Sequence, residues 1–328
     1  MVPSSLTDDL LHPKLELRAC QLLGVVCRKG GVECPLICDE DARAFLDAVE
    51  RDPSLAIRLT TPVDQLPHYT MQTPADEAAL QADALDRKRD LDVLQQLGLM
   101  PGDTRRARWL FELLFQRIAT PDGICAYDTP GWEGCPYARS GAYASVRERG
   151  PHAVVYQRPQ AEKDEARRQS AERIANDPVL VVRSHHVMCM ACWYNGGEGP
   201  LAMRPEDTIW ELWQRIQRDP EVPLKLVEGC CEACFCCDGY HPETTRCVHG
   251  GGLIRDYKKD LDVFQKLGLQ PGAVMPAREF LDLLFSRIKE TTEVCGYGDG
   301  VVRSDEWAVC GGPEGNPGYA RTAATGMV

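Results

Sequence analysis

Hydrophobic and polar positions recur along the first half of the chain in a pattern that predicts short strands between longer helices. Residues 14–18 alternate like a strand, and residues 19–28 form an apolar run that suits a buried helix. Similar patterns predict a strand at 54–59, helices at 41–50, 83–97 and 105–118, loops at 34–38 and 62–74, and an irregular segment to about residue 149. This order of elements predicts an α+β fold that is mostly helical with a small sheet.

The second half of the chain runs through the same order. Residues 90–102 (DLDVLQQLGLMPG) recur as residues 260–272 (DLDVFQKLGLQPG), with ten of thirteen positions identical. Such a match indicates an internal tandem repeat. We therefore predict two homologous domains with irregular Cys-rich loops, at residues 1–149 and 179–328, joined by a charged helical linker at 150–178.

Composition and charge narrow the class of protein. The chain has 328 residues, of which 44% are hydrophobic and 26% charged, as in ordinary globular proteins. A net charge of -12 and the lack of a dense Lys/Arg cluster argue against a nucleic-acid partner. We see no secretory signal and no apolar run of about 20 residues that would cross a membrane, so we expect a cytoplasmic protein.

Cysteine content points to metal chemistry. The chain has 16 cysteines, and six of them fall within residues 230–247, where few apolar side chains are available to order the chain. In a reducing compartment such thiols suit metal or redox sites better than disulfides, although free thiols and disulfides stay open. Cys231/Cys234 and Cys234/Cys237 both have Cys-x-x-Cys spacing, but they share Cys234, so only one pair can be used in full.

The repeat sorts the remaining thiols. Three cysteines occur at equivalent places in both halves, as the pairs Cys27/Cys192, Cys125/Cys295 and Cys135/Cys310. Each half then has enough thiols for a four-ligand site, although a buried structural cysteine is the alternative for any one of them. Cofactor-ligand candidates are Cys20, Cys27, Cys34, Cys38, Cys125 and Cys135 in the first half and Cys189, Cys234, Cys237, Cys247, Cys295 and Cys310 in the second, with Cys192 and Cys230 as further metal ligands.

Ligand spacing favours an iron–sulfur cluster over zinc. Zinc sites usually present two tight pairs, and Cys189-x-x-Cys192 with Cys234-x-x-Cys237 would fit that alternative. The thiols near the end of each half stand singly, as is common around a [4Fe-4S] cluster, which aromatic and glycine neighbours would shield from water.

Several short motifs of the second half, taken together, resemble the small bacterial and archaeal domain of unknown function 1284. Its usual order is Arg-x-His-His-Leu-Leu-Cys, an Asp-Ile-Cys loop followed by another Cys, and a tail with Glu-Trp-x-x-x-Cys. The matching segments are residues 183–189 (RSHHVMC), residues 226–234 (LVEGCCEAC), the Leu-Gly-Leu-x-Pro-Gly turn, and a tail with Cys295 and Trp307-x-x-Cys310.

The resemblance spans most of residues 179–312 and implies iron–sulfur binding; the activity of the family is unknown. By position it implies the ligands Cys189, Cys234, Cys247 or Cys237, Cys295 and Cys310. The first half departs from the pattern, because Cys20-Gln21 replaces His185-His186 and Gly24 replaces Cys189. The first half has therefore either rebuilt its site from other thiols or lost the cluster.

These observations predict a [4Fe-4S] protein, with one cluster for each repeat, that transfers electrons to a partner oxidoreductase. One alternative is an enzyme whose cluster has an open iron acting as Lewis acid, with His185 or His186 handling protons. Another is an interaction module held together by Zn²⁺. No nucleotide-binding, serine-nucleophile or His-Glu-x-x-His motif is present, so no catalytic residue is predicted.

Overall fold

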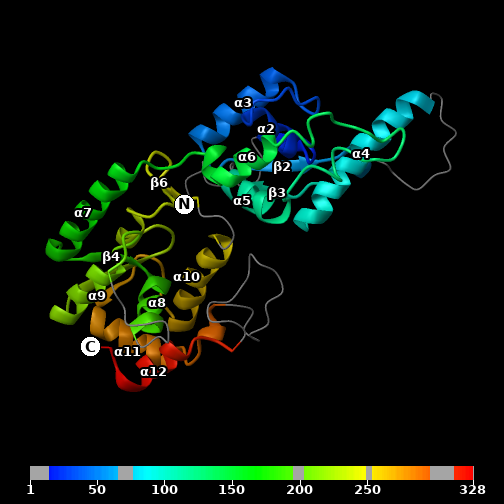
Figure 1. Ribbon diagram of the computed structural model, residues 1–328. Helices are drawn as coiled ribbons and strands as arrows, with labels where there is room; N and C mark the ends of the chain where they lie inside the picture. The colour runs from blue at the N-terminus through cyan, green and yellow to red at the C-terminus, as the bar shows by residue number, and fades with distance from the viewer. Residues whose placement is uncertain (1–14, 66–76, 195–202, 249–252, 296–313, 328) are drawn as a thin grey trace. The chain divides into compact units, whose positions relative to one another are not determined.

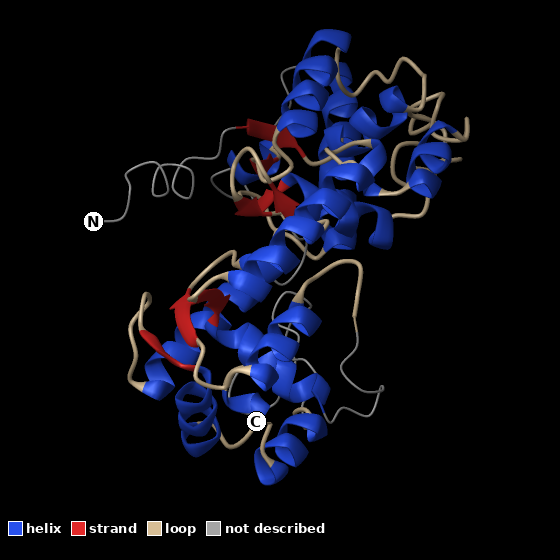
Figure 2. Ribbon diagram, turned by 90° about the vertical axis from the view of Figure 1, so that its left-hand side faces the viewer, coloured by secondary structure: helices blue, strands red, loops and turns tan. Residues whose placement is uncertain are grey.

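The protein has an α+β fold, which confirms the predicted class (Figure 1). The computed structural model describes residues 15–65, 77–194, 203–248, 253–295 and 314–327. Within them, helices predominate, and the strands are short and form sheets of two or three (Figure 2). The chain divides into two compact units, Met1–Gln157 and Arg158–Val328.

Unit 1 contains a sheet of order β1-β2-β3, made of Leu15–Arg18, Ala56–Thr60 and Thr104–Arg106. β1 pairs with β2 in parallel, and β2 pairs with β3 in antiparallel orientation. The accompanying helices are α2 (Gln21–Lys29), α3 (Asp39–Arg51), α4 (Glu77–Leu97), α5 (Ala107–Arg117) and α6 (Ala142–Arg149), with 3-10 turns η1 (Pro62–Gln65) and η2 (Pro151–Ala153).

Unit 2 has a sheet of the same form. Its order is β4-β5-β8, made of Leu180–Arg183, Pro223–Val227 and Val274–Pro276, with one parallel and one antiparallel pairing. β6 (Tyr240–His241) and β7 (Arg246–Cys247) add a small antiparallel pair. The helices are α7 (Gln160–Asn176), α8 (Ser184–Tyr194), α9 (Ile209–Arg218), α10 (Leu253–Leu267), α11 (Ala277–Arg287) and α12 (Pro317–Thr325), with 3-10 turns η3 (Glu232–Cys234) and η4 (Thr291–Glu293).

Individual hydrogen bonds also recur between the units. The Tyr143 hydroxyl donates to the Ile118 carbonyl at 2.9 Å, and Tyr319 donates to Ile288 at the same distance. Each tyrosine is buried and lies on the helix, α6 or α12, that packs against α2 or α8 respectively. The two units thus share topology and local bonding, while their origin by duplication stays a prediction.

The apolar run predicted as a buried helix is α2, which lies in the core of unit 1. All residues from Leu22 to Cys27 are buried, and Gly24 is part of this packed surface. A Cβ atom at Gly24 would lie 3.0 Å from Ile37 Cγ2, which is tighter than most real contacts. The close approach of α2 to the following loop therefore depends on a residue without a side chain.

Three segments differ from the sequence-based expectations. The stretch expected to be irregular contains α6, and the helix expected from residue 105 begins with β3 instead. The charged helix expected as a linker is α7, but it belongs to unit 2. It packs against α9, and Ser170 and Ile174 on it are buried, because a few small and apolar positions are enough to dock an otherwise polar helix.

Candidate metal centres

Four buried thiols converge in unit 1, and we call them the first thiol set: Cys27, Cys34, Cys125 and Cys135. Cys27 lies on α2, Cys34 in the loop after it, and the other two in the loop after α5; none is more than 5% exposed. The Cys135 thiol donates a hydrogen bond to Cys34, which in turn donates to Cys27. The backbone amide of Cys135 donates to the Cys125 carbonyl at 2.8 Å. Three separate segments thus bring sulfur atoms together.

A buried cation stands beside this set. Arg89 on α4 donates to the Cys125 carbonyl at 2.9 Å and to Asp86 at 2.7 Å. Its Nε is buried and has no hydrogen-bond partner among the described residues. Burial raises the pKa of Cys125 to about 12, and the charge of Arg89 opposes that rise. A buried donor without a partner among the described residues, close to Cys125 and Cys135, suits an anionic group such as a thiolate metal centre.

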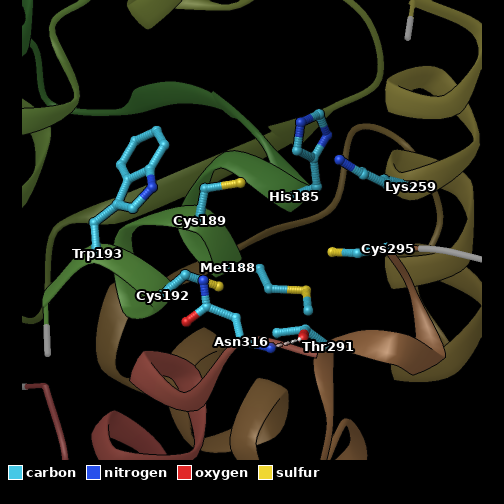
Figure 3. A pocket seen from close by; sticks show the side chains of 9 residues that line it. All are labelled: His185, Met188, Cys189, Cys192, Trp193, Lys259, Thr291, Cys295 and Asn316. Atoms are coloured by element: carbon cyan, nitrogen blue, oxygen red, sulfur yellow. Dashed lines mark hydrogen bonds between the residues drawn. The ribbon is translucent and has the colours of Figure 1, made fainter. Parts of the chain in front are cut away.

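In unit 2, three thiols wall a small cavity of about 50 Å³ (Figure 3). We call Cys189, Cys192 and Cys295 the cavity thiols; the first two lie on α8, and the third follows η4. The full lining is His185, Met188, Cys189, Cys192, Trp193, Lys259, Thr291, Cys295 and Asn316. Cys310, the predicted fourth ligand, and Trp307 lie outside the described residues.

The first thiol set and the cavity thiols lie at equivalent places in the two units, except that one thiol comes from a loop in unit 1 and from a helix in unit 2. Cys27 and Cys125 correspond to Cys192 and Cys295, but Cys34 has no cysteine counterpart in the loop after α8. The aligned partner of Cys189 is Gly24, and a Cβ atom at Gly24 would lie 3.5 Å from the Cys34 sulfur. A helix thiol in unit 2 therefore stands close to where a loop thiol stands in unit 1.

The buried cation recurs as well. Lys259 on α10, which corresponds to Arg89, is 2% exposed and pairs with Asp256 at 3.0 Å. Its side chain reaches the cavity wall, as Figure 3 shows. Each unit thus places a buried cation next to its thiols.

A second group in unit 2, the His186 site, joins His186 on α8 with Cys231 and Cys234 at η3. Their ligand atoms all lie within 4.8 Å of one another. Cys231 Sγ is 3.3 Å from His186 Nδ1 and 3.9 Å from Cys234 Sγ. These three residues could hold a metal ion. Cys231 is not among the ligands predicted from the sequence, although the Cys231-x-x-Cys234 spacing points to it, and His186 is open there as a ligand or a proton donor.

Protonation in the His186 site favours ligation. Hydrogen bonds from Cys230 and Cys231 hold the pKa of Cys234 well below its usual range, and the nearby charge of Arg183 acts in the same direction. Burial raises the pKa of Cys231 and lowers the pKa of His186 to about 4. These shifts favour a thiolate at Cys234 and a neutral imidazole at His186, the forms that bind metals.

Asp260 on α10 connects both sites of unit 2. This fully buried carboxylate accepts hydrogen bonds from Arg183 Nε at 2.8 Å and from the Gly229 amide at 3.2 Å, and it lies 2.7 Å from His185 Nδ1. Burial alone would raise the pKa of Asp260, but the hydrogen bond and charge of His185, together with those of Arg183, lower it. The network fixes α8 and the start of the Cys-rich loop to α10.

The other predicted ligands are not members of these groups, although Cys237 and Cys247 lie close to the thiols of the His186 site. Cys20 is buried beside Asp90, and burial together with that carboxylate raises its pKa. Cys38 is exposed, and its sulfur accepts the Asp41 amide to cap α3. In the Cys-rich loop, Cys237 accepts a hydrogen bond from the Gly239 amide at 3.3 Å, and Cys247 lies on β7. No disulfide joins the described cysteines.

No protein-family model, curated protein or solved structure matches the chain. The resemblance to domain of unknown function 1284 therefore stays a prediction. The described helices include none that combines the length and apolar character required to span a bilayer. Fold and sites together define a cysteine-rich α+β protein with a His/Cys group able to bind a metal.

Proposed function

We propose that this protein binds iron–sulfur clusters, one at the first thiol set and one at the cavity thiols, and passes single electrons to a partner protein. The observation that carries the proposal is the cavity of about 50 Å³ walled by Cys189, Cys192 and Cys295 (Figure 3). Sulfur donors around an enclosed space are what a cluster requires, since its core must fit between the thiolates. When bound, the cluster supplies the electron-transfer chemistry.

The surroundings of the thiols support an anionic cofactor. A [4Fe-4S] cluster with four thiolate ligands carries net negative charge, and a buried cation nearby stabilises it. Lys259 and Arg89 supply that charge in the two units, and the Nε atom of Arg89 still lacks a partner among the described residues. The first thiol set belongs to the apolar core of unit 1, and Cys192 and Cys295 belong to the core of unit 2, while Cys189 is partly buried at its edge; the cores keep water away from most of these thiols.

His185 contributes a positioned polar group at the cavity wall. Asp260 lies 2.7 Å from its Nδ1 and so fixes the orientation of the ring. The contact fixes a proton on Nδ1 and holds the ring in one orientation at the cavity wall.

Of the two thiol groups, zinc is a second candidate only at the first thiol set. There Cys34 is within hydrogen-bonding contact of both Cys27 and Cys135. Thiols that touch one another suit a single tetrahedral ion better than a cluster, whose core separates its ligands.

Purification without oxygen tests the proposal. We expect a brown protein with about eight iron and eight sulfide per chain if both units hold a [4Fe-4S] cluster. Cys192→Ser and Cys295→Ser should each remove about half of both, and the matched Cys27→Ser and Cys125→Ser should remove the other half. Cys38→Ser is the control, because this exposed cap residue lies outside both thiol groups.

Two results would contradict the proposal in different ways. A folded, colourless protein with neither iron nor sulfide after anaerobic purification would remove the cluster from both units. Iron and sulfide at half the expected amount, together with zinc that is lost in Cys34→Ser, would assign zinc to unit 1 and a cluster to unit 2 alone.

A further inference from the structure

The spacing of the His186 site fits one tetrahedral ion. Two sulfur ligands of zinc are about 3.8 Å apart, and a sulfur and a nitrogen ligand about 3.6 Å apart, when each bond has its usual length and the angle is tetrahedral. The observed separations are 3.9 Å between Cys231 and Cys234 and 3.3 Å between Cys231 Sγ and His186 Nδ1. Donors this close suit ligands of one metal atom, whereas the thiolates of a [4Fe-4S] cluster each bind a different iron and stand farther apart.

A fourth donor is close by. Cys230, next to Cys231 in the chain, interacts with Cys234 and lies just outside the group whose ligand atoms are all within 4.8 Å of one another. Cys231 also accepts a hydrogen bond from the backbone amide of Arg183, at the junction of β4 and α8. A set of three thiols and one imidazole is a common ligand set of structural zinc.

The His186 site is distinct from the cavity, and the described residues of unit 1 contain no equivalent group. None of His186, Cys231 and Cys234 lines the cavity. At the position that corresponds to His186, unit 1 has Gln21, whose side-chain amide donates to the Leu36 carbonyl. A site present in one unit only cannot be required by the shared fold, so it serves a feature specific to unit 2.

That feature is the Cys-rich loop around η3 and the β6/β7 pair. Its sequence from residue 229 to 247 offers few apolar side chains for a core. Polar contacts to α7 hold its base, where Glu232 pairs with Arg173 at 2.9 Å and its carbonyl accepts the Ser170 hydroxyl at 2.8 Å. A metal bound between η3 and α8 would fix the opposite side of the same turn.

We infer that His186, Cys230, Cys231 and Cys234 bind one zinc ion, separate from any cluster, and that this ion holds the Cys-rich loop against α8. The zinc is structural, since all four ligands come from the protein and none is left open to a substrate. The inference does not depend on the proposed iron–sulfur function, because the cavity thiols contribute no ligand.

The test uses the full-length protein, purified without oxygen, with zinc, iron and sulfide measured on the same samples. We expect zinc in addition to any iron, and a loss of about one zinc per chain in Cys231→Ser. His186→Gln, which introduces the residue that unit 1 carries at this position, should weaken zinc binding at least about 10-fold without unfolding the unit. The affinity is measured by competition with a chromogenic chelator.

Cys236→Ser is the matched control. Cys236 lies in the same loop and is equally buried, but it sits beside Arg167 rather than at the site, so zinc content should not change. Cobalt substitution adds a direct readout: the visible bands of tetrahedral thiolate cobalt should appear in the wild type and in Cys236→Ser but not in Cys231→Ser.

Two outcomes would overturn the inference. Unchanged zinc content and chelator competition in both Cys231→Ser and His186→Gln would exclude these residues as ligands. Loss of iron and sulfide in place of zinc would make them part of a cluster site. Iron-free protein that keeps one zinc at this site would instead end the proposed function and leave the zinc inference standing.

Discussion

Replacing Asp260 with Asn gives a quantitative test of the network beneath α8. The substitution keeps the shape of the side chain but removes the charge that faces Arg183 and His185. Asp260 is fully buried and the Arg183 side chain is 5% exposed, so water cannot replace the lost carboxylate. Removing one partner of such a buried pair typically costs about 3–5 kcal/mol, and we expect unit 2 to lose stability in that range.

Asp90→Asn is the matched change in unit 1. Asp90 accepts Arg18 Nη2 at 2.8 Å and the Cys20 amide at 2.9 Å, so the bonding is similar. The Arg18 side chain is 30% exposed and lies 3.7 Å from a second carboxylate, Asp86. Solvent and Asp86 therefore compensate for part of the loss, and we expect a smaller cost of about 1–3 kcal/mol.

Hydrogen exchange of the full-length protein, followed by mass spectrometry of peptides, measures both effects in one molecule. A two-unit chain need not unfold in one step, so peptides from α2 and α8 are read separately. Relative to the wild type, Asp260→Asn should lower the free energy of opening mainly in peptides from α8, and Asp90→Asn mainly in peptides from α2. Equal losses, or a larger loss for Asp90→Asn, would show that burial does not determine the strength of these pairs.

Three further changes test other parts of the structure. The pKa of Asp260 is lower in the folded state than in the unfolded chain, where it is about 3.9. Its contribution to stability is therefore complete above about pH 3.9 and is lost as the pH falls through the folded-state pKa. In acid denaturation, the stability of unit 2 should depend less on pH in Asp260→Asn than in the wild type. Tyr143→Phe and Tyr319→Phe should each lower the free energy of unfolding by about 1 kcal/mol in hydrogen-exchange experiments, because each removes one buried hydrogen bond of 2.9 Å. Clearly different losses of stability in the two variants would mean that the two bonds are not equivalent. Cys34→Ser should lower the metal content of unit 1, whereas Cys38→Ser, at an exposed helix cap, should leave it unchanged; equal metal content in both variants would show that Cys34 is not a ligand.

Periodicity predicted most of the elements but missed those with little amphipathic pattern. The strand expected at 54–59 is β2 (Ala56–Thr60), and the helix expected at 41–50 is α3 (Asp39–Arg51). α6 was missed because only Ala142, Tyr143 and Val146 face the core, which is too few for a recognisable stripe. Its position depends instead on tertiary contacts such as the Tyr143 hydrogen bond.

The ligand groups could be predicted only as a list of residue types. Repetition of Cys27, Cys125 and Cys135 marked these residues as candidates, but nothing in their spacing showed that Cys34 would join them. The choice between Cys231 and Cys237 as partner of Cys234 was open for the same reason. Only the packing of η3 against α8, which brings His186 Nδ1 to 3.3 Å from Cys231, distinguishes the two.

Cys34 in the loop of unit 1 and Cys189 on the helix of unit 2 supply a thiol at a similar place from different sequence positions. The two units therefore resemble each other more in structure than in sequence. In a sequence alignment of the two units, Gly24 is aligned with Cys189, and Cys34 is aligned with no cysteine. A metal centre instead requires sulfur atoms around one point, and a thiol from the helix can meet that need as well as a thiol from the loop. Where the loop supplies Cys34, the helix position must stay small, because the Gly24 Cβ site already lies 3.0 Å from Ile37. Where the helix supplies Cys189, the following loop need not supply a thiol, and its sequence can diverge while three thiols still line the cavity.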